Sequence, residues 1–294
     1  MRKLITIFTL IMCICHISYS QIDYNKIIIK KSLSQQWELD SIHKRGTFRL
    51  VSYKPIYISA ARWSTKKNEE PFSESGEFAT KDKNFFNNIE AKLQVSFKTK
   101  VLQNVLFGKG DIWVAFSQSA NWQVYNKKLS RAFRELNYEP EVMIVFPAHI
   151  KLLNGQIRTI GMNFNHQSNG KDIPTSRSWN RIIFDIGYEY KDWNVNLRPW
   201  YRLPDAEDEN PQITKFIGDG ELEVGTNFGK HEIYAIMQHS FSTFKYGNLQ
   251  LNYVFPIHGH LRGHAQMFQG YGETLIDYNV TQTIFAIGMS FANW

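Results

Sequence analysis

A histidine, a serine and an asparagine with complementary chemistry lie close together in the chain, at His166, Ser168 and Asn180. A serine hydroxyl is a weak nucleophile at neutral pH, so Ser168 would need a general base, and the imidazole of His166 could take its proton. The side-chain oxygen of Asn180 could hold that imidazole in the required tautomer, although an amide supplies no negative charge. The three residues therefore form a candidate set for nucleophilic catalysis by serine.

A structural role for the same residues is the alternative. His166 and Ser168 could simply be interfacial polar residues at the end of a strand, because a His-x-Ser pair alone is not specific. The sequence around Ser168 also lacks the G-x-S-x-G nucleophile elbow, which argues against an α/β-hydrolase. The catalytic interpretation therefore depends on the whole stretch from Gly161 to Arg181 and not on one pair.

Hydrophobic periodicity predicts the elements that would carry these residues. From about residue 89, segments of roughly ten residues alternate between apolar and polar side chains, which indicates β-strands with two different faces. The clearest segment has an apolar face made of Ile89, Ala91, Leu93, Val95 and Phe97. The further predicted strands are 105–118, 141–149, 156–168, 180–190, 194–203, 222–228, 231–240, 247–255, 261–269 and 281–291. Their number approaches the even count near twelve that a closed barrel would use.

Strand parity predicts the direction in which the candidate residues point. The apolar face of their strand runs through Ile160–Phe164 at every second residue, and His166 and Ser168 continue that face. Beyond the intervening loop, Asn180 begins the apolar face of the next strand. An antiparallel hairpin could therefore bring Asn180 beside His166, with the histidine and serine facing outward.

Alternation of this kind fits either a membrane barrel or a water-soluble β-sandwich. The aromatic content of 15% and the aromatic C-terminal segment 291–294 favour the barrel, and no apolar run after residue 20 approaches the ~20 residues of a membrane helix. We therefore predict an all-β fold, a transmembrane antiparallel barrel of about twelve strands over residues 81–294. Residues 21–80 are expected to form a periplasmic or barrel-plugging N-terminal extension, in which Thr47–Ile58 could supply an opening strand.

The first twenty residues are predicted to be a secretory signal peptide with cleavage after Ser20. A basic start precedes a largely apolar run from Leu4 to Cys15, as in other export signals. Both cysteines lie in this run, so the exported chain would contain no disulfide. Removal of the two basic residues lowers the formal net charge from +7 to +5, and the remaining basic residues are scattered, which gives little support for binding of nucleic acid.

The stretch from Gly161 to Arg181 resembles the catalytic block of the outer-membrane phospholipase A family. In that family, N-H-x-S-N-G and P-T-S-R-S-W-N-R carry the serine, histidine and asparagine, and both motifs are present here. Further segments resemble the family in the same order along the chain, namely Phe133–Pro140, Arg198–Tyr201, Asn210–Lys215 and Gly270–Asn279. The resemblance spans about residues 89–294.

The resemblance implies a twelve-stranded barrel in the outer membrane of a Gram-negative bacterium, with the active site on the lipid-facing wall near the extracellular edge. The implied activity is calcium-dependent hydrolysis of phospholipid acyl esters, as a phospholipase A1/A2 that also cleaves lysophospholipids. Ser168 would be the nucleophile, His166 the general base and Asn180 the residue that orients it. The main-chain amide of Gly170 would donate to the oxyanion.

The family also implies a calcium ion, Ca2+, that completes the oxyanion hole at the interface of a homodimer. Its ligands correspond to the main-chain oxygen of Ser130 in one subunit and to the Lys171 carbonyl and Ser176 hydroxyl of the other. Gln118 corresponds to a glutamine that hydrogen-bonds across the otherwise apolar dimer surface, whereas a glutamine that faces the lumen is the alternative.

This chain departs from the family pattern beside the implied calcium ligands. Lys171 stands where the family usually has arginine, and Ile173 stands where it has an acidic residue. The first change leaves a carbonyl ligand unaffected, but the second puts a secondary calcium site in doubt. Asp172 or the acidic loop Asp205–Glu209 could compensate, although a solvated charged loop is the other interpretation. A non-enzymatic, porin-like or structural barrel is the alternative function, and loss of His166 or Ser168 would be its signature.

Overall fold

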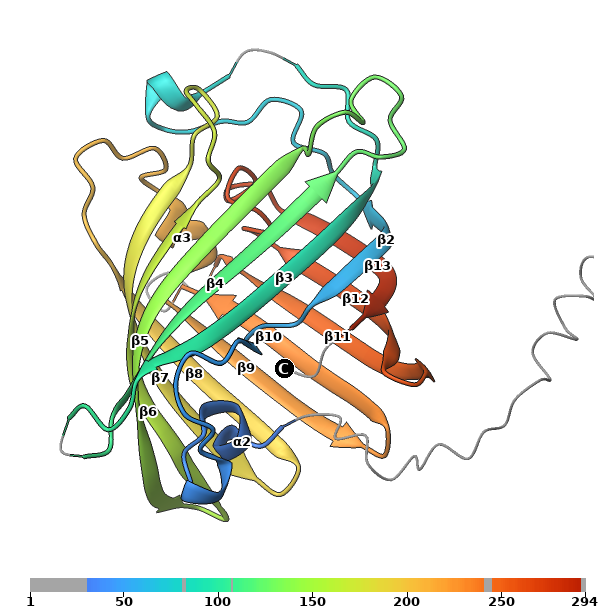
Figure 1. The fold of residues 1–294 in the computed structure, drawn as a ribbon. Helices are drawn as coiled ribbons and strands as arrows, with labels where there is room; N and C mark the ends of the chain where they lie inside the picture. Colours follow the sequence, from blue (N-terminus) through green and yellow to red (C-terminus); the bar gives the residue numbers. More distant parts are fainter. Residues whose placement is uncertain (1–30, 81–82, 107, 241–244, 292–294) are drawn as a thin grey trace, which may run out of the picture.

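Twelve antiparallel strands, β2 to β13, close into a barrel (Figure 1), and a short strand β1 is added beside β3. The computed structural model describes residues 31–80, 83–106, 108–240 and 245–291. The predicted signal peptide and its cysteines therefore lie outside the described residues. Within these ranges no helix is long and apolar enough to cross a membrane. The predicted fold class, an antiparallel β-barrel of about twelve strands, is confirmed.

The elements have the following bounds. The strands are β1 Val51–Ser52, β2 Tyr57–Ser64, β3 Ile89–Leu102, β4 Asp111–Trp122, β5 Glu135–Leu152, β6 Gly155–Ser168, β7 Ser178–Tyr190, β8 Trp193–Arg202, β9 Gly220–Phe228, β10 His231–His239, β11 Gly247–His258, β12 Leu261–Gly270 and β13 Gln282–Ser290. The short helical turns are α2 Leu33–Trp37, η2 Ser41–His43, η3 Gly76–Phe78 and α3 Ile213–Ile217.

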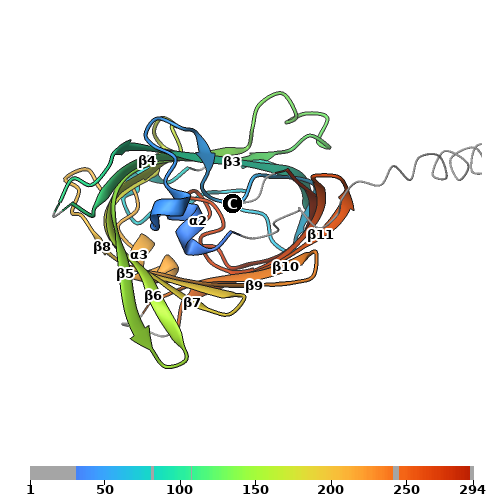
Figure 2. The same cartoon turned by 60° about the horizontal axis from the view of Figure 1, so that its bottom comes forward.

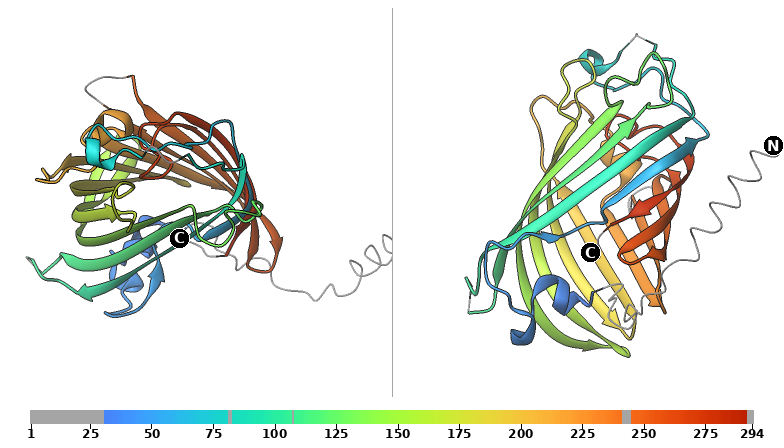
Figure 3. Two further views of the ribbon diagram at one scale, coloured as in Figure 1. Left: turned by 90° about the horizontal axis from the view of Figure 1, so that it is seen from above. Right: turned by 45° about the vertical axis from the view of Figure 1, so that its right-hand side comes forward.

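Closure of the sheet depends on the pairing of β2 with both β3 and β13. Every other neighbouring pair of strands is also antiparallel, so the ring has hairpin connections throughout. One end carries tight turns, such as the one between Leu152 and Gly155, and the other end carries the longer loops (Figures 1 and 3). In outer-membrane barrels the short turns face the periplasm and the long loops face the outside of the cell.

The segment predicted to open the sheet overlaps the first barrel strand only at its end. The short strand β1 lies within residues 47–58, but β2 spans Tyr57–Ser64, so the barrel sheet takes in residues that the sequence assigned to the extension. A β-bulge explains the error, because the register shifts between Ser59 and Arg62 and both of these side chains are buried. Two buried residues three positions apart break the period of two on which the prediction depended.

The strands predicted from residue 89 onward are present, with two shifted starts. β4 begins at Asp111 and not at residue 105, because residues 103–106 and 108–110 belong to a turn in which Asn104 and Gly108 have positive φ angles. β5 begins at Glu135 and not at residue 141. Pro140 lies inside this segment, and a proline within a strand pattern argues against a continuous strand.

The two faces of the wall differ as the alternation requires. On β6, Ile160, Met162 and Phe164 are 43%, 46% and 47% exposed on the outer surface. The inner surface is largely polar and charged, and many of its charges form ion pairs. The guanidinium of Arg198 alone contacts Glu141, Asp185 and Glu221, each at 3.1 Å. Ion pairs of this kind offset the large cost of removing charges from water.

The segment 33–43, which contains α2 and η2, packs into the end of the barrel that carries the short turns, where α2 lies within the ring of strands (Figure 2). Leu33 and Trp37 of α2 join a buried cluster with Trp113 and Met143 from the inner wall. The ammonium of Lys98 lies 3.0 Å from the centroid of the Trp37 ring. Ion pairs add to these contacts, with Glu38 3.0 Å from Lys100 and Asp40 2.7 Å from Arg158. The segment therefore plugs this end of the lumen.

Replacing Trp37 with alanine should destabilise the protein by about 3 kcal/mol, because a buried ring is lost together with a cation–π contact. The measurement is the free energy of unfolding in denaturant for protein folded in lipid vesicles. Ile42→Ala, in the same segment but at an 83% exposed position, is the matched control and should change stability by less than about 0.5 kcal/mol. Equal effects would contradict the packing role of α2.

Candidate active site

The hairpin formed by β6 and β7 brings two of the candidate residues into contact. His166 and Asn180 are directly opposite in the ladder, and Nδ1 of His166 lies 2.8 Å from Oδ1 of Asn180. An amide oxygen accepts a hydrogen bond, so this contact assigns the ring proton to Nδ1. Nε2 is then left as the free acceptor of the imidazole, which is the state that a general base requires.

Ser168 lies two residues beyond His166 on the same strand and therefore on the same face. Its ladder partners are Ser178 on β7 and Tyr138 on β5. The face continues downward through Phe164, which is exposed on the outer wall. The predicted set thus lies on the outside of the barrel, at the end that carries the long loops.

The loop between the two strands, residues 169–177, is organised by the buried side chain of Asn169. Its Oδ1 accepts hydrogen bonds from the amides of Arg177 at 2.9 Å and Lys171 at 3.3 Å, and its Nδ2 donates to the carbonyl of Thr175 at 2.8 Å. Gly170 follows with a φ of +63°, where a Cβ atom would lie 3.0 Å from the ring of Tyr138. Both the backbone conformation and the close ring favour glycine at this position.

Lys171 and Ser176 lie in this same loop, and a carboxylate from another loop contacts the second of them. The hydroxyl of Ser176 donates to Oε1 of Glu209 at 2.5 Å. Oε2 of Glu209 is buried and has no hydrogen-bond partner within the described part of the chain. The hydroxyl of Ser73 donates to the Glu209 carbonyl at 2.6 Å and so holds the acidic loop in place.

Ser130 lies in the β4–β5 loop, separate from Lys171 and Ser176. Its main-chain oxygen accepts a hydrogen bond from the indole of Trp122 at 2.8 Å, which leaves a second lone pair on the carbonyl. Gln118 pairs with Val95 and Tyr138 in the ladder. Val95 is 38% exposed on the outer wall, so this register puts Gln118 on the outer wall too.

Sequence reasoning missed several residues that hold this region together. Asn169, Arg177 and Glu135 are all buried around the loop, and Glu209 was considered only as part of a charged loop. The guanidinium of Arg177 donates to the carbonyl of Phe78 at 2.8 Å, and burial lowers its pKa. The Asn169-Gly170 pair is a turn signal that could have indicated the first of these residues. Contacts between distant loops leave no local signal in the sequence.

No three His, Cys, Asp or Glu side chains gather as a metal-binding group among the residues that the structure describes. The polar oxygens that do lie near one another here are the Ser176 hydroxyl and the Glu209 carboxylate, and both are hard oxygen donors of the kind that Ca2+ prefers.

Comparison with known proteins identifies relatives over most of the chain. The family described as Phospholipase A1 matches residues 33–291. Phospholipase A1 of Klebsiella pneumoniae is 35% identical over 244 residues, which cover 82% of each chain. Phospholipase A1 of Escherichia coli strain K12 is 34% identical over 243 residues, 82% of this chain and 81% of the relative.

Solved structures of the same kind are also similar in fold. The outer membrane phospholipase (OMPLA) dimer of Salmonella typhi with bound calcium has a TM-score of 0.75 at 31% identity, covering 85% of this chain and 94% of that one. Outer membrane phospholipase A from Escherichia coli has a TM-score of 0.74 at 32% identity, covering 83% and 94%. The agreement of family, relatives and fold shows that this chain belongs to the phospholipase A1 family, ester hydrolases that form β-barrels in the outer membrane of Gram-negative bacteria.

Proposed function

We propose that this barrel hydrolyses phospholipid acyl esters with Ser168 as nucleophile, His166 as general base and Asn180 as the residue that orients the base. The observation that carries the proposal is the 2.8 Å contact between His166 Nδ1 and Asn180 Oδ1 on the outer wall. A comparison structure supports the role of the asparagine, since it is an active-site mutant of the E. coli phospholipase with asparagine replaced by alanine.

Proton transfer follows from the tautomer of His166. Nε2 takes the proton of the Ser168 hydroxyl as its oxygen attacks the ester carbonyl, and the imidazolium then returns the proton to the departing alcohol. Water repeats the sequence on the acyl-enzyme and releases the fatty acid. Asn180 keeps Nδ1–H fixed throughout, but it carries no charge that would stabilise the imidazolium.

The tetrahedral oxyanion needs donors that are already in place. The amide of Gly170 is the protein donor that we assign, two residues beyond Ser168 in a loop ordered by Asn169. A bound calcium ion would supply further positive charge to the oxyanion. Ser130 of one subunit, through its main-chain oxygen, and Lys171 and Ser176 of the other would hold this ion.

The residues of the loop fit a calcium ion. The buried and unpartnered Oε2 of Glu209 lies on the carboxylate that contacts Ser176, so a negative charge is available where a cation would be held. Ile173 removes an acidic residue from the family pattern in the same loop, and Glu209 supplies a carboxylate from outside it. We therefore assign Glu209 to the calcium site as a compensating anion.

A homodimer is the active form in this proposal, because the calcium ligands come from two subunits. Gln118 lies on the outer wall among apolar side chains, where it would hydrogen-bond to the partner subunit. An enzyme in a membrane is always surrounded by its lipid substrate. When the calcium site is split between two subunits, the monomer lacks part of the site and is inactive. The porin-like alternative is less well supported, because α2 fills one end of the lumen and ion pairs link side chains across its inner wall.

Ser168→Ala should lower the rate of ester release from detergent-dispersed phospholipid by about 1000-fold or more, because the nucleophile is lost. The measurement is fatty-acid release by refolded protein in calcium and in chelator, and release should require calcium. Ser178→Ala is the matched control, since this hydroxyl lies directly opposite on the neighbouring strand and takes no part in the mechanism. Undiminished release by the Ser168 variant, or no release by folded wild-type dimer in calcium, would refute the proposal.

Glu209→Gln should weaken calcium binding by about tenfold, because a carboxylate beside the ligands is neutralised. Calcium affinity is measured by the concentration that produces half-maximal chemical crosslinking of the dimer. Glu207→Gln, an exposed position in the same acidic loop, serves as the control and should leave the affinity unchanged. If the two variants have the same crosslinking midpoint, Glu209 does not contribute to the calcium site. The acidic loop is then simply a solvated charged loop.

A further inference from the structure

One buried carboxylate holds the residues on both sides of Gly170 from the inside of the barrel. Glu135 begins β5 and is 1% exposed. Its Oε1 accepts from Asn169 Nδ2 at 3.1 Å, and its Oε2 lies 2.7 Å from the ammonium of Lys171. The same ammonium donates to the carbonyl of Arg134 at 2.7 Å. The short segment from Asn169 to Lys171 is therefore tied at both ends to the start of β5.

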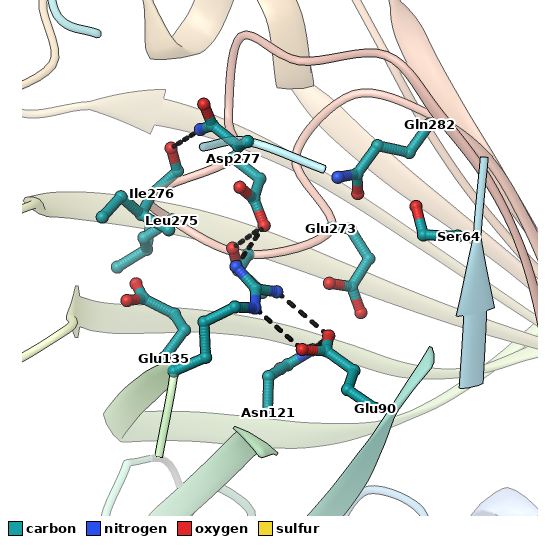
Figure 4. A network of polar contacts seen from close by, with 12 residues as sticks. Ser64, Glu90, Asn121, Glu135, Glu273, Leu275, Ile276, Asp277 and Gln282 are labelled. Atoms are coloured by element: carbon teal, nitrogen blue, oxygen red, sulfur yellow. Dashed lines mark hydrogen bonds and ion pairs between the residues drawn. The ribbon is translucent and has the colours of Figure 1, made fainter. Parts of the chain in front are cut away.

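This anchor is itself fixed in a larger network of charges at the loop end of the lumen (Figure 4). Asn137 also donates to Oε1 of Glu135, at 3.1 Å, and its Oδ1 accepts from the main-chain amide of Leu275 at 3.2 Å. The neighbouring guanidinium of Arg134 donates to Glu90 at 2.9 Å and to Asp277 at 3.1 Å. These contacts join β3, β5 and the β12–β13 loop around Glu135.

The location of this anchor has a functional consequence. Glycine has no side chain through which its own position could be fixed, and Gly170 sits at a positive φ angle. The direction of its amide and that of the Lys171 carbonyl therefore depend on how the flanking residues are held. An oxyanion donor must be in place before the reaction, because reorganisation during the reaction reduces its effect.

We propose that Glu135 is a positioning residue for the reaction, which fixes the Gly170 amide and the Lys171 carbonyl on the outer wall through contacts made on the inner side. The inference rests on the proposed function. It extends that function by adding a residue that never meets the substrate, since Glu135 is enclosed within the lumen.

The test compares two buried carboxylates. Glu135→Gln removes the charge that holds Lys171 and should lower kcat by about 100-fold while KM stays within about threefold, since misplaced donors affect the transition state more than binding. Glu232→Gln is the matched control, because Glu232 is also 1% exposed and pairs with a buried arginine, Arg262, at 2.8 Å near the periplasmic turns. This control should fold less stably but keep its kcat.

A second set of variants tests the same ion pair in case Glu135→Gln does not fold. Lys171→Met removes the same ion pair from a side chain that is 30% exposed in a loop, so the barrel should fold normally. Its kcat should fall as in Glu135→Gln, and Lys171→Arg should recover most of the loss because it restores the charge. The double variant Glu135→Gln with Lys171→Met should be no slower than the slower of the two single variants, because each single variant already breaks the Glu135–Lys171 ion pair.

Equal kcat values for Glu135→Gln and Glu232→Gln would overturn the inference, as would additive losses in the double variant. If Glu135→Gln fails to fold, an unchanged kcat in Lys171→Met would overturn it equally. An inactive wild-type protein would instead contradict the proposed function, so the two failures are distinguishable.

Discussion

Backbone groups cannot remain unpaired in lipid, and the pairing of β2 with both β3 and β13 is what satisfies this constraint. Once the sheet is closed, every strand has one face towards lipid and one towards the lumen. Apolar side chains must therefore occupy the first face, and charges are confined to the second, where they must find partners. The triple ion pairing of Arg198 is one outcome of that confinement.

The same constraint explains how much of the fold could be predicted from the sequence. Regular strands such as β6 show the period of two that lipid imposes, and their bounds were predicted within a few residues. The bulge between Ser59 and Arg62 breaks that period, and for this reason the position of β2 was not predicted correctly. The start of β5 was missed because Pro140 lies inside the strand, and a proline within a strand pattern argues against a continuous strand.

Some contacts of the candidate site could also be predicted from the sequence, and others could not. His166 and Asn180 are opposite one another because they belong to one hairpin, so local parity was enough to predict their contact. Glu209 and Glu135 reach the same region from other parts of the chain, so their contacts depend on how separate loops and strands pack together. The proposed catalytic residues could thus be predicted from the sequence, whereas the residues that support them required the three-dimensional structure.

In the proposed mechanism, the outward direction of His166 and Ser168 also determines how substrate reaches them. A molecule that is already part of the lipid layer arrives by lateral diffusion in two dimensions and not from bulk water. The relevant concentration is then the number of susceptible lipids per unit area of the surrounding leaflet. Diluting those lipids with inert ones should slow the enzyme even when the total amount of substrate is unchanged.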